Sequence, residues 1–511
     1  MNQETNAILV KGDVSGIQEF IFNVKSDKAA QELKGRSFFI KVLVEVAIQY
    51  LLDHFMVVDP NKIKECKVST SGGNFILRLP AVAAYHEIVK NARLDFTKAL
   101  EYTGLNLCIA CVEITGDYKK DIQLLNTGGR EAKFMFYSEN TDYFKEFDKE
   151  FVTRISNKWI EFTTWIKLNK SFSINKTDSI ASNLAFKSKS VEFGGYKVTF
   201  NPDEKGISLE NYLESLFPMK RNNTLKEFRD LSESDKINIR DASIIELKGG
   251  EDGLNKLGIL ALDVDGLGAV MESVESEEAH TELDKLLNSF FNLRLREIIQ
   301  NENLTYIKLC SKRQQLPVPR FCNKIYSVTA GGDDSFFVGK WNTILDFAIK
   351  INEEFILQFP KLTLSAGLII VDPKYPVVRF ADQVENALRK AKYKYKGNKG
   401  NICLFGEVIK WDILTEIISL RQTLKKQNLT SGMLAKARLS ANNVVDYSAY
   451  RLEDFWKMGY YLRDAADKDI IIKRIEGYVA RAIKAGNDTL TSRNYRKILP
   501  IAARLAELDH R

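Results

Sequence analysis

Acidic side chains and paired glycines occur in a short pattern that the chain carries twice. In the second half an apolar run ends in Asp-Val-Asp-Gly at residues 263–266, and Gly-Gly-Asp-Asp follows at residues 331–334. In the first half a similar run ends in Asp-Val-Ser-Gly at residues 13–16, and Gly-Gly-Asn-Phe follows at residues 72–75. The first copy keeps the glycines but has serine and asparagine in place of acids. We therefore expect one working site and one degenerate partner.

The acidic copy is suited to phosphoryl transfer. Mg²⁺ is usually held by one or two carboxylates, so that substrate phosphates can fill its other positions. Two ions about 3.5–4 Å apart stabilise the attacking and leaving oxygens of an in-line displacement. Asp263 ends an expected strand, and Asp333 and Asp334 occupy a hairpin that can lie beside it. Gly331 and Gly332 let the hairpin turn take a positive φ and let a triphosphate approach the backbone.

Each motif alone has a simpler explanation. Asp-Val-Asp-Gly is a common turn, and it fails as a calcium loop because its twelfth residue is Val274, where an EF-hand requires glutamate. Gly-Gly-Asp-Asp alone is an ordinary hairpin turn. Both motifs together, on strands in this order, favour a nucleotidyl-transfer site. The sequence contains no Gly-x-x-x-x-Gly-Lys-Ser/Thr segment, so a P-loop ATPase is not supported.

Hydrophobic periodicity places both motifs on the same order of elements. In the first half we expect a strand at 7–11, a helix at 29–55, a hairpin at 68–79, a helix at 82–100 and a strand at 105–114. In the second half we expect a strand at 257–264, a helix at 277–299, a hairpin at 324–338, a helix at 345–358, a strand at 362–371, a helix at 378–394 and a strand at 401–405. This β-α-β-β-α-β order is ferredoxin-like. Its period is too long for a solenoid, so a duplicated domain is indicated.

Composition limits the class of protein. A chain of 511 residues exceeds a single core, and 45% hydrophobic with 28% charged residues is ordinary for a globular protein. No run reaches the ~18 apolar residues of a membrane helix, and no signal peptide is visible. We expect a cytoplasmic protein, because six cysteines in so long a chain do not form a disulfide framework and fit a reducing compartment. The net charge of +7 permits an RNA or nucleotide partner without establishing one. None of the four histidines precedes an aspartate, so a His-Asp nuclease centre is not expected.

Together the motifs resemble the large signature subunit of type III CRISPR effector complexes, the polymerase/cyclase subunit. The matching segments are residues 12–22, 33–38, 71–75, 260–268, 330–336, 364–367 and 402–406. The resemblance implies an α+β protein with two ferredoxin-like palm (nucleotide cyclase-like) domains, an intervening insertion and a C-terminal helical bundle. The expected domains are a degenerate, acceptor-side first palm at 1–150, an insertion at 151–250, a catalytic second palm at 251–410 and a helical domain at 411–511.

The resemblance also assigns roles to residues within the matched motifs. The catalytic and metal-ligand positions are taken by Asp263, Asp333 and Asp334, with the Val264 carbonyl as a further ligand. The donor nucleotide would be contacted by Gly331, Gly332, Ser335, Asp265, Lys392 and Lys399. The acceptor nucleotide would lie near Asp13, Ser15, Gly16, Gly72, Gly73 and Asn74. For the two lysines a solvated loop remains the alternative.

The activity implied is a nucleotidyltransferase that uses ATP and two Mg²⁺ (or Mn²⁺) ions and is switched on by target RNA. Its product would be a cyclic oligoadenylate, or AMP joined to a small acceptor, serving as a messenger in antiviral defence. The implied partners are guide RNA and target RNA within a multi-subunit complex, and a small helical effector subunit at the C-terminal domain. Two alternatives remain open: a stand-alone diguanylate-type cyclase and a non-catalytic scaffold subunit.

Two departures from the family pattern matter. Many members begin with a His-Asp nuclease domain, whereas this sequence starts directly at the first palm motif, so we expect no DNA cleavage by it. Members often carry a four-cysteine zinc site. Here Cys108 and Cys111 fall in an expected core strand, and Cys310 and Cys322 flank a loop. Because buried strand cysteines are the commoner explanation, zinc is not expected.

Overall fold

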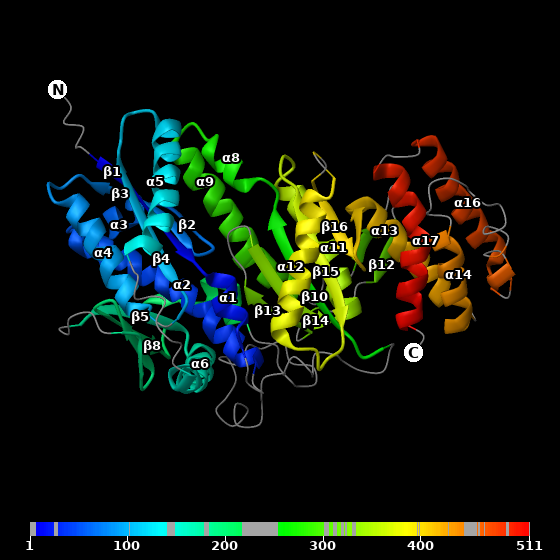
Figure 1. Ribbon diagram of the computed structural model, residues 1–511, viewed down its shortest axis with the longest axis horizontal. Coiled ribbons are helices and arrows are strands. Elements are labelled where there is room, and N and C mark those ends of the chain that lie inside the picture. Colours follow the sequence, from blue (N-terminus) through cyan, green and yellow to red (C-terminus); the bar gives the residue numbers. More distant parts are fainter. Residues whose placement is uncertain are drawn as a thin grey trace. The chain divides into compact units, whose positions relative to one another are not determined.

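The computed structural model (Figure 1) describes most of the chain. The described residues are 7–24, 29–101, 103–139, 149–177, 183–216, 254–300, 306–309, 314–317, 321, 324–329, 334–395, 397, 399–427, 429–443, 457, 460–463, 465–486 and 490–509. They divide into two compact units. One comprises residues 1–244, 266–300 and 326–336, and the other comprises residues 245–265, 301–325 and 337–511.

The first half of the chain contains a four-stranded sheet, called the N-terminal sheet below. Its elements are β1 (Ala7–Ser15), α1 (Ile17–Phe22), α2 (Ala29–His54), α3 (Pro60–Cys66), β2 (Lys67–Ser71), β3 (Asn74–Pro80), α4 (Tyr85–Ala99) and β4 (Asn106–Glu113). The strand order is β2-β3-β1-β4, with β1 antiparallel to both neighbours. This is the ferredoxin-like arrangement predicted from periodicity. The strand β2 lies at one edge of the sheet.

Helix α2 is buried around most of its circumference, because a second layer covers the side that would otherwise face solvent. That layer follows α5 (Tyr118–Glu139) and consists of α6 (Lys149–Leu168), β5 (Ser171–Lys176), β6 (Ala185–Lys187), β7 (Ser190–Phe193), β8 (Tyr196–Asn201) and β9 (Ile207–Ser208). Trp159 of α6 packs with its ring centroid 5.1 Å from that of Phe39 in α2. The strands form a sheet of order β6-β7-β8-β5-β9, for which no elements were predicted.

The second half repeats the same strand order within a larger sheet. Its elements are β10 (Leu257–Val264), α8 (Leu267–Glu272), α9 (Glu277–Asn288), the π-helical η6 (Ser289–Arg294), α10 (Leu295–Gln300), β11 (Tyr306–Leu309), β12 (Gln314–Pro317), β13 (Ile325–Thr329), β14 (Asp334–Lys340), α11 (Trp341–Gln358), β15 (Leu364–Val371), α12 (Val377–Tyr393), β16 (Asn401–Leu404) and β17 (Glu407–Lys410). The order is β13-β14-β10-β15-β16-β17, with β13 at an edge. The α+β class is confirmed, and the helix expected at 277–299 contains a π-helical turn.

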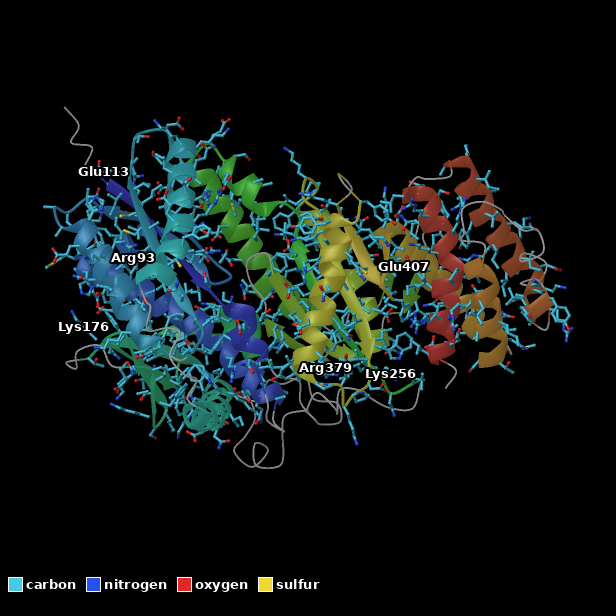
Figure 2. The ribbon with its side chains drawn as sticks, in the orientation of Figure 1. Arg93, Glu113, Lys176, Lys256, Arg379 and Glu407 are labelled. Carbon is cyan, nitrogen blue, oxygen red and sulfur yellow. The ribbon has the colours of Figure 1, made fainter. Side chains whose placement is uncertain are left out.

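The described part of the chain after Lys410 is helical, as the resemblance implied. Its long helices are α13 (Trp411–Lys425), α14 (Ser431–Asn443), α16 (Lys468–Lys484) and α17 (Leu490–Asp509). Helix α17 packs against the other three (Figure 1). Its Lys497 pairs with Glu407 of β17, labelled in Figure 2, which joins the helices to the sheet. Among the described helices, none is long and apolar enough to cross a membrane.

A buried ion cluster ties the last helix to the rest of its unit. Arg421 of α13 donates two hydrogen bonds to Asp509 of α17, at 2.7 and 2.8 Å. Its guanidinium also lies 4.7 Å from the ring centroid of Trp341. Burial raises the pKa of the neighbouring Asp346 carboxyl from 3.8 to about 6, although Arg421 favours its charged form. The cluster therefore contains one carboxyl group, that of Asp346, whose ionised form is disfavoured by burial.

This raised pKa predicts a pH-dependent stability. Asp346 ionises at lower pH in the unfolded chain than in the folded chain. The free energy of unfolding therefore falls as the pH rises from about 4 to 6. Asp346→Asn should therefore be more stable than the wild type above pH 6, by about 1–3 kcal/mol, and the gain should shrink toward pH 4. Thermal unfolding midpoints across this range check it, with the exposed Asp382→Asn of α12 as control. A difference that does not change with pH would contradict the assignment.

Candidate nucleotide and metal site

Both Asp-Val-x-Gly motifs adopt the same local structure. In each, a strand runs into a glycine with positive φ that directly precedes a short helix: Gly16 has a φ of 81° before α1, and Gly266 has a φ of 70° before α8. A Cβ atom on Gly16 would lie 2.3 Å from the Gly104 carbonyl oxygen, so the turn requires glycine for space as well as for conformation. The duplicated motif is thus a duplicated strand–turn–helix.

The strand-end aspartates are paired with lysines from equivalent helices. Asp263 forms an ion pair with Lys392 of α12, the helix that follows the fourth strand of its fold. Asp13 forms an ion pair with Lys133 of α5, which follows the fourth strand of the first copy, at 2.7 Å. Sequence reasoning identified Lys392 but missed Lys133. Its position in the helix after the fourth strand, like that of Lys392, was the signal that could have found it.

Asp265 plays a different part from Asp263. Its side chain is buried and accepts hydrogen bonds from the hydroxyls of Thr363 and Ser365 at 2.8 and 2.7 Å. It also accepts one from the backbone N–H of Gly400 at 2.8 Å. These three donors occupy the carboxylate and fix the segment that leads into β16. Lys399, which precedes Gly400, is exposed.

The acidic hairpin falls partly outside the described residues. Gly331, Gly332 and Asp333 are not described, and Asp334 is described only as the first residue of β14. The next residue, Ser335, is buried. The strand β14 lies beside β10 in the sheet order, so the two acidic motifs stand on neighbouring strands. Val264 is buried on β10, opposite Leu364 of β15.

Two cavities flank the glycine hairpin of the first copy. One, of about 330 Å³, is lined by polar and charged side chains that include Lys11, Asp13, Asn74, Arg130 and Lys133. The other, of about 350 Å³, is lined by residues that include Lys41, Gly72, Gly73, Tyr212 and Asn288. Ser71 and Asp284 line both cavities, whereas Ser15 and Gly16 line neither. The residues expected around an acceptor are thus divided between two spaces.

Three basic and three acidic side chains line the first cavity, so its formal charge is balanced. Lys11 donates a hydrogen bond to Asn126 at 2.7 Å, and Asn126 in turn donates to Glu272 of α8 at 2.9 Å. Burial lowers the pKa of the Lys11 ammonium, and Asp13 opposes that effect. The other two basic groups are paired, Arg130 with Glu272 and Lys133 with Asp13. The cavity is therefore polar, with charged groups of both signs in its lining.

Cys108 and Cys111 of the first copy lie in β4. Cys108 is buried and Cys111 is half-buried. Burial raises the pKa of both thiols, which disfavours the thiolate that zinc requires. Cys310 and Cys322 lie outside the described residues.

Comparison with known proteins follows the two halves of the chain. The family model described as Cas10/Cmr2, second palm domain, matches residues 256–403. The family model described as Csm1 subunit domain B matches residues 6–171. The chain belongs to the Cas10/Csm1 family. The second-palm match includes Asp263, Lys392 and the Gly-Gly-Asp-Asp motif, so the acidic copy is the second palm.

Two curated relatives are named CRISPR system single-strand-specific deoxyribonuclease Cas10/Csm1 (subtype III-A). The protein of Methanocaldococcus jannaschii is 25% identical over 495 residues, covering 80% of this chain and 60% of the relative. The protein of Enterococcus italicus is 25% identical over 467 residues, covering 81% of this chain and 56% of the relative. The chain thus spans little more than half the length of these Cas10 relatives.

Solved structures share the fold. A chain of a Csm1-Csm4 cassette in complex with one ATP is similar with a TM-score of 0.71 and 19% identity, over 98% of this chain and 70% of that chain. A chain of a Csm1-Csm4 cassette in complex with cA4 also has a TM-score of 0.71, with 18% identity, over 98% of this chain and 70% of that chain. The likeness extends over nearly the whole chain and therefore includes both sheets with the ferredoxin-like strand order.

The contacts of Asp265 predict a stabilising role that Asp263 lacks. Asp265→Ala would leave three donors without their acceptor, which should lower the free energy of unfolding by about 3 kcal/mol. Asp263→Asn, the matched control two residues earlier, breaks one ion pair and should cost about 1 kcal/mol or less. Thermal unfolding of both variants measures the difference. Equal midpoints for the two variants would show that Asp265 is not the residue that holds this segment.

Proposed function

We propose that the chain is a nucleotidyltransferase that joins adenylate units from ATP to an acceptor hydroxyl. The proposal rests on the duplicated strand–turn–helix, in which each copy pairs an aspartate with a lysine. The second palm has all the acidic residues of the motif, whereas the first copy has serine and asparagine in place of two of them. Both copies lie in one chain. This favours an internal donor–acceptor pair over a diguanylate-type cyclase built from two identical chains.

The second palm is proposed as the donor side. Asp263 and the hairpin acids Asp333 and Asp334 would hold Mg²⁺ or Mn²⁺, with the Val264 carbonyl as a further ligand. The donor set fits a hard cation, because carboxylate oxygens on neighbouring strands are the ligands such ions prefer. The Asp265 carboxylate is already held by three donors, so we assign it to fixing the Gly400 segment rather than to the metal.

The remaining donor-side residues would position the triphosphate. Gly331 and Gly332 permit close approach of the phosphates to the backbone, with Ser335 following. Lys392, now paired with Asp263, would move its ammonium to the phosphates when the carboxylate binds a cation. Lys399 lies next to the segment that Asp265 fixes and is exposed, so it is free to reach a phosphate from the rim.

The first copy is proposed as a degenerate palm on the acceptor side. Its Asp13, Gly72, Gly73 and Asn74 line the two cavities beside the hairpin, where polar side chains and charged groups of both signs would hold the acceptor nucleotide. Ser15 and Gly16 would contribute through the turn that shapes this end of β1. Cyclic oligoadenylate and AMP joined to a small acceptor are both compatible products.

The chemistry would be an attack by the acceptor hydroxyl on the α-phosphate of ATP, with pyrophosphate leaving. When bound, the metal ions lower the pKa of the hydroxyl and neutralise charge on the phosphates. The chain's own contribution is to fix the two nucleotides in line and to place ammonium groups beside the charge that develops on the leaving group.

The wider assignment is also a proposal. We place the domains at 1–150, 151–250, 251–410 and 411–511, as first palm, insertion, catalytic second palm and helical domain. The chain would act within a type III CRISPR complex with guide RNA, and target RNA would switch it on. Solved relatives are Csm1-Csm4 assemblies, including one within a type III-A CRISPR-Csm interference complex. A small helical effector subunit would dock on the C-terminal helices.

The direct test removes the hairpin acids. Asp333→Ala/Asp334→Ala should reduce adenylate synthesis at least about 1,000-fold while leaving the thermal midpoint near that of the wild type, because two polar turn residues are replaced. The assembled complex is incubated with ATP, Mg²⁺ and target RNA, with small metabolites as acceptors in parallel, and products are resolved by mass spectrometry. A complex without target RNA is the control.

Synthesis retained in the double variant would refute the site. No adenylate product from the wild type under any acceptor, together with no Mn²⁺ binding, would instead favour a scaffold subunit.

A further inference from the structure

Each Gly-Gly hairpin has one strand at the edge of its sheet. These are β2 in the N-terminal sheet and β13 in the six-stranded sheet. An edge strand has backbone N–H and C=O groups that face away from its neighbour, and when buried they need other partners. In both hairpins a long helix from the other half of the chain supplies them. The contacts described next all lie within one compact unit.

The edge strand β2 is capped by helix α9. Asp284 is 4% exposed and accepts hydrogen bonds from the Thr70 backbone N–H at 3.1 Å and from the hydroxyls of Ser69 and Ser71 at 2.9 and 2.5 Å. Asn288, one turn later, donates to the Thr70 carbonyl oxygen at 3.0 Å. Both outward groups of Thr70 are thereby satisfied, two residues before the glycine turn.

The edge strand β13 is held by helix α2. The fully buried Lys34 donates a hydrogen bond to the Ser327 carbonyl oxygen at 2.5 Å. Its ammonium lies 5.1 Å from the centroid of the Tyr326 ring. The Tyr326 hydroxyl in turn donates to the carbonyl of Ala30, one turn before Lys34. Two consecutive residues of β13 are therefore fixed by one helix face.

The second strand of the acidic hairpin is also in contact with the first half. The ring of Phe336 on β14 lies 4.6 Å, centroid to centroid, from that of Phe22 at the end of α1. Contacts of α1 and α2 thus reach both strands that flank the acidic turn.

Lys34 and Asp284 occupy equivalent positions. Each stands 21 residues after the aspartate near the end of the preceding strand, Asp13 for Lys34 and Asp263 for Asp284. Lys34 donates a hydrogen bond to a backbone carbonyl, and Asp284 accepts one from a backbone N–H. The helix that follows each strand-end aspartate therefore holds the hairpin of the other half.

We propose that Lys34 and Asp284 are positioning residues for the two sides of the reaction. Lys34 fixes the hairpin that carries the donor-side acids, and Asp284 fixes the hairpin of the acceptor side. The inference rests on the proposed function. Residues that orient metal ligands without touching the metal typically change metal affinity by 10- to 100-fold when removed. Loss of Lys34 should therefore alter the metal requirement, whereas loss of Asp284 should alter the use of acceptor.

The test compares Lys34→Met, Asp284→Asn and a matched control in the assembled complex with guide and target RNA. Methionine fills the space of Lys34 without a hydrogen-bond donor. The control is Arg36→Met, because Arg36 is also buried on α2 but donates to Glu32 and to the Phe20 carbonyl, not to the hairpin. We expect Lys34→Met to raise the Mg²⁺ concentration for half-maximal synthesis about tenfold and Arg36→Met to leave it unchanged.

For Asp284→Asn we expect the Mg²⁺ dependence of the wild type and a KM about tenfold higher for an added acceptor, probed with 5′-triphosphorylated diadenylate at fixed ATP. Equal shifts of Mg²⁺ dependence in Lys34→Met and Arg36→Met would overturn the role of Lys34. An unchanged acceptor KM would overturn that of Asp284.

Hydrogen exchange provides a readout that does not depend on catalysis. Lys34→Met should speed amide exchange in peptides from residues 325–340 and not in those from 67–80, and Asp284→Asn should do the reverse. If the wild type makes no product, the proposed function fails while exchange still decides whether the two helices hold the hairpins. Unchanged exchange in both variants would overturn the inference itself.

Discussion

An edge strand must find partners for the backbone groups that face away from its sheet, and both Gly-Gly hairpins contain such a strand. Here the partners are side chains: the buried Asp284 and the half-buried Asn288 for β2, and the buried Lys34 for β13. A side-chain cap fixes the register of one strand against one helix, which a looser surface contact would not do. The two copies are therefore not independent folds joined by a linker, because a helix of each copy hydrogen-bonds to the edge strand of the other copy's hairpin.

The same constraint explains why α2 is apolar on nearly every side and yet contains a buried lysine. One face packs on its own sheet, and another packs on α6 through Trp159. The remaining face carries Lys34, which meets a carbonyl of β13. A buried ammonium is costly unless it is hydrogen-bonded, so its presence in so apolar a helix indicates a specific contact rather than a solvated surface position.

The two aspartates of the second-palm motif illustrate how neighbouring acids can differ in role. Asp265 is surrounded by three donors that fix the Gly400 segment, whereas Asp263 is paired with Lys392 from the following helix. In the first copy Ser15 stands where Asp265 would be, while Asp13 keeps its lysine partner, Lys133. The serine therefore replaces a carboxylate that, in the second palm, is occupied in holding a loop. A change that removes a candidate metal ligand from the first copy is therefore Asn74, which stands on the hairpin where the second palm has Asp333.

The sequence by itself determined the repeated order of strands and helices, because period-2 and period-3.6 apolar patterns and the paired glycines are local properties of the chain. It also determined the family, through motifs whose residue types are dictated by chemistry. Only the tertiary structure revealed Lys133 beside Asp13, the engagement of Asp265 and the contacts of Lys34 and Asp284 with hairpins more than 200 positions away. Those pairings depend on which elements become neighbours, and no local pattern records that. A buried lysine and a buried aspartate look like ordinary polar helix residues until the edge strands that need them are in place.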